Sequence, residues 1–231
     1  MICSAHQPHY LPWLGYCDKI ARSDVFVLLD NVQYTRREFQ NRSRIRTARG
    51  WEWLTVPVLQ HGKREQLFRE VEIDPTSDWR RAHWATLKQH YGGAAHWGDL
   101  AAFLEKFYAT EWRTLFDLCD FFLRDTLRRL NIRTRVVRES ELGTGGLKTE
   151  RIAQVCAAVG ADAYLSGAGA RAYLDEPLLS ARGIRVIWQS FVHPVYPQRY
   201  PGFEPNMAVL DLLANCGAAS RDALLGAGAH A

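Results

Sequence analysis

The chain has 231 residues, of which 47% are hydrophobic and 23% are charged, so its composition is that of an ordinary globular protein and excludes disordered and fibrous classes. Its 29 Lys and Arg against 25 Asp and Glu give a formal net charge of +4, with no basic block that would indicate a nucleic-acid-binding tail. No apolar run approaches the roughly 20 residues that cross a bilayer, and the first residues lack the pattern of a signal peptide. The five cysteines include no C-x-x-C pair, which predicts reduced thiols, no metal site and a cytoplasmic protein.

The first thirty residues have the pattern of one βαβ unit. The pattern predicts a strand, a helix and a second strand at residues 2–5, 14–21 and 25–29. A proline-rich loop separates the first strand from the helix. Ligands of open α/β sheets bind beyond the carboxyl ends of the strands, where His6 and Asp30 are expected to lie.

The middle of the chain is first polar and then helical. Residues 31–50 are rich in arginine, which most often indicates a solvated loop. The alternative is a site for a sugar-phosphate or carboxylate, because Tyr34, Phe39 and Asn41 lie between the arginines. Strands are predicted over residues 51–58 and 67–73, a helix over 78–91, and one or two long helices between 100 and 130. The helical part therefore predicts an α-rich insertion at residues 74–130.

The last third returns to alternating strands and helices. Strands are predicted over residues 131–137, 162–166 and 184–188, and helices over 149–159, within 171–182 and over 207–215, with Thr149 as a cap. The whole pattern predicts an α/β domain at residues 1–217, with a mostly parallel, Rossmann-like sheet and helices on both faces. Residues 218–231 are rich in Ala and Gly and are expected to form a flexible tail.

The loop after the first strand carries an unusual number of polar and aromatic side chains. They are His6, Gln7, His9, Tyr10 and Trp13. Histidines in this position can neutralise phosphate charge or transfer a proton, and the N-terminus of the following helix can hold an anion. The alternative is that both histidines only satisfy backbone groups of the turn.

A second loop with these properties follows the predicted strand at residues 162–166. The small residues of Ser166-Gly167-Ala168-Gly169 let backbone N–H groups approach a phosphate or carboxylate. Turns of this composition serve packing about as often, and the G-x-S-x-G elbow of a nucleophilic serine is absent.

Ordered sequence blocks along the chain to residue 217 resemble the WbqC-like protein family. The blocks are His6–Tyr16 with Lys19, Asp30 with Gln33 and Tyr34, Asn41 with Arg42, residues 53–57, residues 148–151, residues 164–167, and Tyr196 with Gln198. One departure is Ala208, where the family has a serine. The resemblance implies a protein that attaches an acyl or aminoacyl group, glycyl in particular, to an amine.

A more distant likeness is to nucleotidylyl-transferase-like folds, which include pantothenate synthetase. In those folds histidines of the first loop bind ATP phosphates, and a later basic motif completes the site. His6 and His9 match the first part without the usual His-x-Gly-His spacing, and Lys148 with Arg151 match the second. This likeness is an analogy of fold.

Two groups of residues are therefore predicted to form the site. The predicted catalytic residues are His6, His9, Lys19 and Asp30. The predicted substrate-binding residues are Gln7, Tyr10, Trp13, Tyr34, Asn41, Arg42, Lys148, Arg151, Ser166, Gly167, Tyr196 and Gln198. We expect the N-terminal loop, the Asn41–Arg42 pair and the Ser166–Gly167 turn to converge on one hollow.

The leading hypothesis is an enzyme that forms an amide on the primary amine of a small molecule, such as an amino-sugar nucleotide or a natural-product intermediate. This chemistry needs a base for the ammonium group, donors for the oxyanion and cations for a phosphorylated donor. The donor could be an acyl-adenylate made in place from ATP with Mg²⁺, a thioester, or an aminoacyl-tRNA, although a larger basic face is expected for the last. The alternatives are a nucleotidyltransferase-like enzyme that uses a nucleotide without forming an amide, and a non-catalytic module that binds a nucleotide-sugar. No membrane partner is expected.

Overall fold

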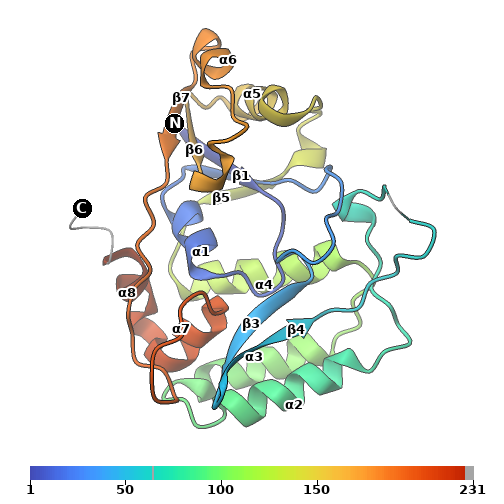
Figure 1. Ribbon diagram of the computed structural model, residues 1–231, viewed down its shortest axis with the longest axis vertical. Helices are drawn as coiled ribbons and strands as arrows, with labels where there is room; N and C mark the ends of the chain where they lie inside the picture. Colours follow the sequence, from blue (N-terminus) through green and yellow to red (C-terminus); the bar gives the residue numbers. More distant parts are fainter. Residues whose placement is uncertain (64, 227–231) are drawn as a thin grey trace.

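The computed structural model describes residues 1–63 and 65–226, which contain a five-stranded parallel sheet with helices around it (Figure 1). The strands are β1 (Ile2–His6), β2 (Val25–Leu28), β5 (Arg135–Arg138), β6 (Ala163–Ser166) and β7 (Arg185–Trp188), in the spatial order β5-β2-β1-β6-β7. Helix α1 (Leu14–Ala21) joins β1 to β2, so the predicted βαβ unit is present. The predicted α/β fold with a mostly parallel sheet is confirmed.

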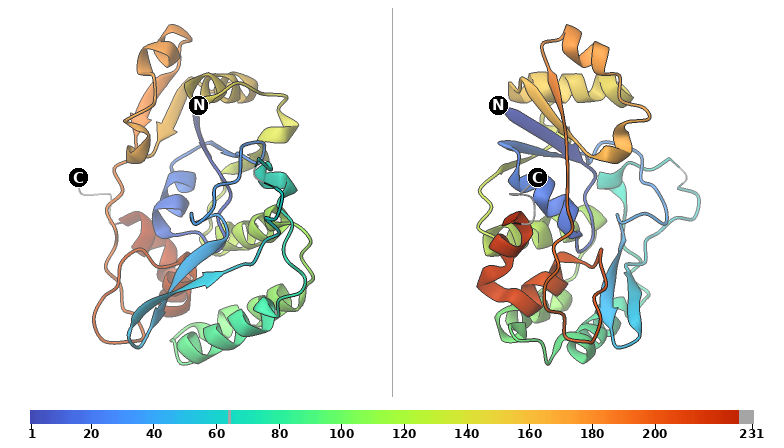
Figure 2. Two further views of the ribbon diagram at one scale, coloured as in Figure 1. Left: turned by 45° about the vertical axis from the view of Figure 1, so that its right-hand side comes forward. Right: turned by 60° about the vertical axis from the view of Figure 1, so that its left-hand side comes forward.

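Strand β2 explains why both faces of the sheet are covered. Side chains of a strand point alternately to opposite faces, so a continuous apolar run needs partners on both sides. Val25 and Val27 belong to the apolar cluster of α5 (Lys148–Val159), and Phe26 and Leu28 belong to that of α1 and α4 (Leu115–Arg129). Figure 2 shows α5 and α4 on opposite sides of the sheet.

The segment between β2 and β5 is larger than the predicted insertion and begins with a separate antiparallel hairpin. It contains β3 (Arg42–Thr47), β4 (Gly50–Thr55), the short 3₁₀ helix η1 (Phe68–Glu70), α2 (Trp79–Tyr91), α3 (Trp97–Ala109) and α4. Strand β3 lies where a loop was expected. Arginines alternate along this strand with the buried Ser43 and Ile45, so the segment looks polar in the sequence and its strand pattern is not apparent. The strand expected over residues 67–73 is wrong, since this segment forms η1 with Phe68 buried.

The remaining segments follow β5 and include several short helices. They are η2 (Glu139–Glu141), η3 (Ala168–Ala170), α6 (Glu176–Ala181), α7 (Val209–Cys216), η4 (Gly217–Ala219) and α8 (Ser220–Gly226). Thr149 does not cap α5 as predicted, because the helix already begins at Lys148. The Thr149 hydroxyl instead accepts a hydrogen bond from the backbone N–H of Asp175 at 3.0 Å.

The chain after residue 217 differs from the flexible tail that was expected. Helix α8 packs beside α1 and α7, and Leu224 is only 1% exposed. Burial of the Leu224 side chain contributes about 2 kcal/mol, and Ala223 and Leu225 pack against the same core, so several contacts together hold the helix in place. The other part of the expected tail, residues 227–231, lies outside the described residues. Within the described ranges, no helix has both the length and the apolar character needed to cross a membrane.

Candidate functional site

The sheet has a topological switch point between β1 and β6. The chain leaves β1 toward β2 and β5 on one side, and β6 and β7 follow on the other side of β1. Ligands of open α/β sheets bind in the crevice outside the strand ends at such a point. His6 ends β1 and Ser166 ends β6, so the sheet itself brings these two residues to the same edge.

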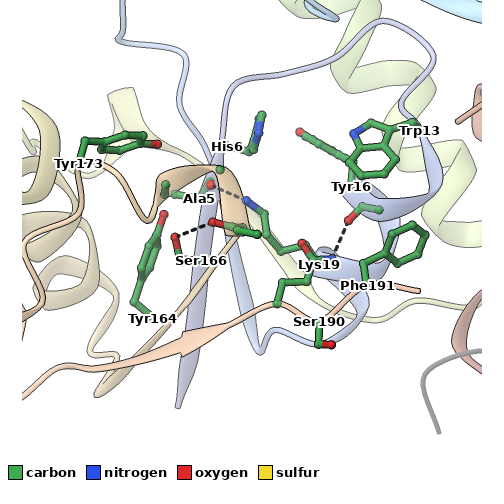
Figure 3. Close-up of a pocket in the computed structure, with 16 residues that line it drawn as sticks. Ala5, His6, Trp13, Tyr16, Lys19, Tyr164, Ser166, Tyr173, Ser190 and Phe191 are labelled. Atoms are coloured by element: carbon green, nitrogen blue, oxygen red, sulfur yellow. Dashed lines mark hydrogen bonds between the residues drawn. The ribbon is translucent and has the colours of Figure 1, made fainter. Parts of the chain in front are cut away.

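Two adjoining cavities open at this edge. The first, with a volume of about 530 Å³, is named here the switch-point cavity, and its walls include Trp13, Tyr16, Lys19, Gly167, Gln189 and Phe191 (Figure 3). The second, of about 550 Å³, is named the adjoining cavity, and its walls include Gln7, Val32, Leu67, Leu147, Lys148 and Arg151. Both cavities are lined by His6, Tyr164, Ser166 and Tyr173. Two ligands bound side by side would therefore meet at His6.

The hydrogen bond of His6 defines which of its nitrogens is basic. Its Nδ1 lies 3.1 Å from the backbone carbonyl oxygen of Gln7. A carbonyl oxygen only accepts, so Nδ1 carries the proton and Nε2 has the free lone pair. Burial, the charge of Lys19 and the nearby ring of His9 lower the pKa of His6 well below its usual value. The imidazole is thus neutral at pH 7 and able to accept a proton.

His9 lies behind His6 and lines neither cavity. Its ring meets that of His6 edge-on, with 4.8 Å between centroids, and stacks on Tyr16 at 4.7 Å. The side chain is 7% exposed, and burial together with the charge of Lys19 lowers the pKa of His9 to about 3. His9 therefore differs from His6 in position and not in charge: it borders neither cavity and supports the His6 ring by packing against it.

Lys19 places a cation at the base of the switch-point cavity. It extends from α1 toward the end of β1, where Nζ donates to the carbonyl oxygen of Ala5 at 3.1 Å (Figure 3). The side chain is 5% exposed, and burial lowers the pKa of Lys19 to about 8. The amine is still largely protonated at pH 7, so it can interact with negative charge in the cavity.

Two glycines shape the switch-point cavity in different ways. A Cβ atom on Gly15 would lie 2.2 Å from the indole of Trp13, so only glycine allows this indole to line the wall. A Cβ on Gly167 would meet nothing within 4 Å, because this residue borders the open cavity. The turn at Gly167 therefore leaves its backbone accessible to a ligand, as expected for an anion-binding turn.

Comparison with known proteins agrees with this reading of the sequence. A sequence model of the WbqC-like protein family matches residues 7–223. The chain belongs to the WbqC-like family. It is also 40% identical over 220 residues to a protein of Mycobacterium tuberculosis (strain ATCC 25618 / H37Rv) named "Uncharacterized protein Rv1507c", covering 94% of this chain and 95% of that protein. No solved structure matches the chain.

The WbqC-like blocks do not all meet at the cavities. His6, Gln7, Trp13, Lys19, Lys148, Arg151, Ser166 and Gly167 are the predicted site residues that line one or both of them. Asn41 and Arg42 line neither cavity, so only two of the three segments expected to converge do so. Asn41 donates to the carbonyl oxygen of Val56 at 2.8 Å, and the Arg42 guanidinium lies over Trp53 at 4.2 Å.

The two predicted tyrosines of the first half are core residues. The Tyr10 hydroxyl lies 2.9 Å from His83 Nδ1 and 2.7 Å from the Tyr108 hydroxyl, among the helices of the insertion. Tyr34 is buried against Phe68. Neither tyrosine lines either cavity.

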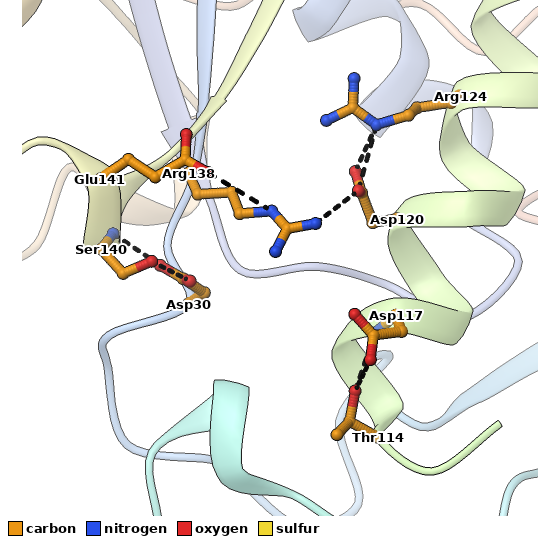
Figure 4. Close-up of polar contacts among 8 residues, drawn as sticks. All are labelled: Asp30, Thr114, Asp117, Asp120, Arg124, Arg138, Ser140 and Glu141. Atoms are coloured by element: carbon orange, nitrogen blue, oxygen red, sulfur yellow. Dashed lines mark hydrogen bonds and ion pairs between the residues drawn. The ribbon is translucent and has the colours of Figure 1, made fainter.

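Asp30 lies at the end of β2 as predicted but is bonded within the protein (Figure 4). Its carboxylate accepts from the backbone N–H of Ser140 at 2.9 Å and from the Ser140 hydroxyl at 2.6 Å. The carboxylate is buried and lines neither cavity. It holds η2 against the strand end, which differs from the predicted catalytic position.

Tyr196 and Gln198 belong to a separate polar group, the Asp211 cluster, which consists of Asp211, Tyr196, Gln198 and Asn215. The Tyr196 hydroxyl and Gln198 Nε2 each donate to the Asp211 carboxylate at 2.8 Å. Burial raises the pKa of Asp211. This cluster lies away from both cavities and ties the chain after β7 to α7.

Lys148 and Arg151 both border the adjoining cavity, but they differ in whether their charge is already paired within the protein. Arg151 Nη1 donates to Glu139 at 2.5 Å and to the carbonyl oxygen of Asn31 at 3.0 Å, so most of its charge is already paired. Lys148 is exposed and forms no ion pair with a described residue. Lys148 is thus the cation that this cavity offers to a ligand.

Residues after β7 complete the switch-point cavity and were not predicted as site residues. Gln189 donates to the carbonyl oxygen of Gly15 at 2.9 Å, and Phe191 meets the Trp13 indole edge-on. Both follow the carboxyl end of a predicted parallel strand, the same rule that identified His6. Across residues 1–63 and 65–226, no group of three or more His, Cys, Asp or Glu side chains is arranged to hold a metal ion.

The family's serine position has a structural explanation. Ala208 is the N-cap residue of α7, and no side chain caps this helix. A serine there would supply the usual cap hydrogen bond. Ala208 is fully buried and lines neither cavity, so a hydroxyl at this position would not face either of them.

Proposed function

We propose that the protein is an enzyme that transfers an activated acyl or aminoacyl group, glycyl among them, to the primary amine of a small molecule. The observation that carries this proposal is the pair of cavities that share His6 and Ser166 as a common wall. Such an arrangement suits a reaction between two bound substrates, because holding both next to one base supplies proximity and orientation.

In this proposal the acceptor amine occupies the switch-point cavity. The positive charge of Lys19 lowers the pKa of a neighbouring ammonium group, so the acceptor loses its proton more easily. Nε2 of neutral His6 accepts that proton when the nitrogen attacks the acyl carbon. Lys19 and the backbone of the Gly167 turn stabilise the negative charge on the carbonyl oxygen.

The donor occupies the adjoining cavity. Lys148 on its rim attracts an anionic donor, and the apolar residues Val32, Leu67 and Leu147 exclude water from the activated acyl group. ATP with Mg²⁺ takes part only where the acyl group is activated in place, whereas a ready-made ester or thioester needs neither.

The turn after β6 favours a second candidate, a nucleotide-dependent transfer that forms no amide. Small-residue turns at switch points commonly bind phosphates, and the Gly167 turn borders the switch-point cavity. The two candidates differ in the product, since a nucleotidyl transfer releases pyrophosphate from ATP without joining an acyl group to an amine.

Mass spectrometry of reaction mixtures tests the proposal. The protein is incubated with amino-sugar nucleotides or other primary amines and with glycine plus ATP and Mg²⁺, aminoacyl thioesters or aminoacyl-tRNA. A new amide is expected, and its rate should fall about 10²- to 10⁴-fold in His6→Ala but not in the exposed control His61→Ala. A nucleotidylated product without an amide, unchanged recovery of a bound ligand, or full activity of His6→Ala contradicts the proposal.

A further inference from the structure

The entire excess of positive charge lies in one short segment. Residues 31–55 contain six arginines and two glutamates, which gives this segment a formal charge of +4. The rest of the chain has 23 Lys and Arg and 23 Asp and Glu, and is therefore neutral. Positive charge that is concentrated in one segment indicates binding of a polyanion more clearly than the modest net charge of the chain does.

The β3–β4 hairpin presents this charge together with flat aromatic rings. Arg44 pairs with Trp53 in the register of the two strands, so both side chains point to the same face. The Arg44 guanidinium lies 4.2 Å from the centroid of the Trp51 ring and 5.0 Å from that of Trp53. We name this surface the arginine–tryptophan face. It consists of Arg36, Arg37, Arg42, Arg44, Arg49, Trp51 and Trp53.

The arginines of this face have no carboxylate partner among the described residues. Eleven arginines elsewhere in the described chain form ion pairs with Asp or Glu. Arg46 is the most heavily bonded arginine of the segment, because it donates to the carbonyl oxygens of Thr47, Gly50 and Pro201. Arg36 and Arg42 each donate to one backbone carbonyl oxygen, of Gln60 and of Arg37. None of the five arginines of the face is neutralised by a described carboxylate, so their charge is available for an external anion.

The arginine–tryptophan face is continuous with the candidate site. The centroid of the Phe39 ring lies 5.5 Å from that of Trp53 and 5.9 Å from that of His9. The His9 centroid in turn lies 4.8 Å from that of His6. The start of the same segment, residues 31–33, lines the adjoining cavity that we assign to the donor. Residues 31–33 thus connect the segment that carries the face to the donor cavity along the chain, and we take this as the route by which the acyl end of a bound ligand reaches the cavity.

We propose that the arginine–tryptophan face binds single-stranded RNA and that the donor is an acyl group esterified to the 3′-terminal ribose of this RNA, as in an aminoacyl-tRNA. This inference rests on the proposed function for its second part. Guanidinium groups pair with successive phosphates, while exposed indole and guanidinium planes stack on unpaired bases. A small phosphorylated donor would need only two or three cations and no aromatic surface beyond the cavity.

The transfer balances without another reagent. The acceptor nitrogen forms a C–N bond with the ester carbon, and the C–O bond to the ribose breaks. The proton that His6 accepts from the amine goes to the ribose oxygen, which leaves as a hydroxyl group. The products are an amide and a deacylated RNA, so neither ATP nor a metal ion enters the balance.

Fluorescence anisotropy with a 5′-labelled 12-nucleotide RNA ending in CCA tests the binding surface. Arg37, Arg44 and Arg49 are changed together to Glu, and the control variant carries the same change at the exposed Arg81, Arg133 and Arg185. Loss of affinity by at least about tenfold is expected for the first variant and less than twofold for the control, with a shallower salt dependence in the first. Trp51→Ala should weaken binding by about five- to a hundredfold.

Several results would overturn the inference. These are equal affinity of both triple variants for the RNA, or equal binding of wild type to inorganic polyphosphate of the same charge. If the protein forms an amide from a thioester, or from ATP and an amino acid, but does not bind RNA, the proposed function is supported and the RNA inference is wrong. If it binds RNA at this face but forms no amide from any donor, the binding surface is supported and the proposed function is wrong. Unchanged circular dichroism spectra of both variants ensure that folding is not what is measured.

Discussion

The Asp211 cluster and the switch-point cavity are both built from buried polar and aromatic residues, yet their bonding differs. The Asp211 carboxylate accepts from Tyr196 and Gln198, both at 2.8 Å, and it borders neither the switch-point cavity nor the adjoining cavity. His6 and Lys19 each have one backbone partner, and both face about 530 Å³ of empty space. Polar groups whose bonds are complete hold a fold together, whereas groups with unused capacity beside a cavity are available to a ligand.

The comparison predicts that the two regions respond oppositely to substitution. Removing a side chain from the Asp211 cluster should cost stability, and removing one from the switch-point cavity should cost activity. A buried cation such as Lys19 even costs folding free energy, because its charged form is taken out of water.

Apart from His6→Ala, the largest effect is expected for Lys19→Met. This variant removes the cation proposed to stabilise the oxyanion, and amide formation should fall about 10²- to 10³-fold. Methionine fills a similar volume, so the free energy of unfolding at pH 7 should stay the same or rise. Rates are measured at saturating donor, with Lys106→Met, on the exposed side of α3, as the matched control. Loss of stability without loss of activity would place Lys19 with the structural residues.

The pH dependence of Lys19 gives a second readout of the same variant. The folded pKa of about 8 lies below the unfolded value of 10.5. Between these values the unfolded chain keeps a proton that the folded chain has released, so wild-type stability gains up to about 1.4 kcal/mol per pH unit from this group. Urea unfolding from pH 8 to 10 should show this contribution in wild type and its loss in Lys19→Met. Equal slopes in both proteins would contradict the buried position of the amine.

The second effect in size is expected for Asp211→Ala. The substitution removes the acceptor of the Tyr196 hydroxyl and one of the two acceptors of Gln198 Nε2, which should lower the free energy of unfolding by about 2–4 kcal/mol. The exposed Asp78→Ala should change it by less than about 0.5 kcal/mol. At a temperature where the variant is folded, its activity per molecule should match wild type. A large loss of activity in the folded variant would join this cluster to the site.

The sequence predicts the sheet and the switch-point residues well because both follow from local pattern. Continuous apolar runs predicted β2 and its parallel neighbours, and parallel strand ends must meet at one edge. That rule placed His6 and Asp30 at the strand ends, and Ser166 was expected near His6 because its turn also follows a predicted strand.

The rest depends on contacts that a linear pattern does not contain. Strand β3 was missed because arginines occupy its outward positions, and α8 was missed because a few contacts of an Ala-rich segment determine its burial. Asn41 and Arg42 were expected at the site, but the direction in which residues 31–41 cross the molecule is set by packing of the hairpin. Composition likewise hid that the net charge lies in one segment of the chain, residues 31–55.

The acid stability of the protein should depend on His9. Its folded pKa of about 3 lies below the unfolded value of 6.5, so between these values the unfolded chain binds a proton that the folded chain excludes. The free energy of unfolding therefore decreases as the pH falls below 6.5, and His9 accounts for a loss of about 2 kcal/mol at pH 5. His9→Phe keeps the stacking on Tyr16 and should remove this part of the loss. Denaturation midpoints at pH 5 and pH 7 measure it, and an unchanged pH dependence would show that the imidazole is protonated in the folded protein.

The smallest effect concerns Asp30, which the sequence placed in the site and the structure bonds to Ser140 (Figure 4). Ser140→Ala removes the 2.6 Å hydroxyl bond and keeps the backbone bond, so unfolding should become easier by about 1 kcal/mol. If Asp30 is structural, the rate of amide formation stays within twofold of wild type, as it should in the exposed control Ser180→Ala. If Asp30 takes part in the reaction, loss of the hydroxyl that positions its carboxylate lowers the rate by more than twofold in the folded variant. The two outcomes show whether the Asp30 carboxylate has a structural role, like that of Asp211, or takes part in the reaction with His6.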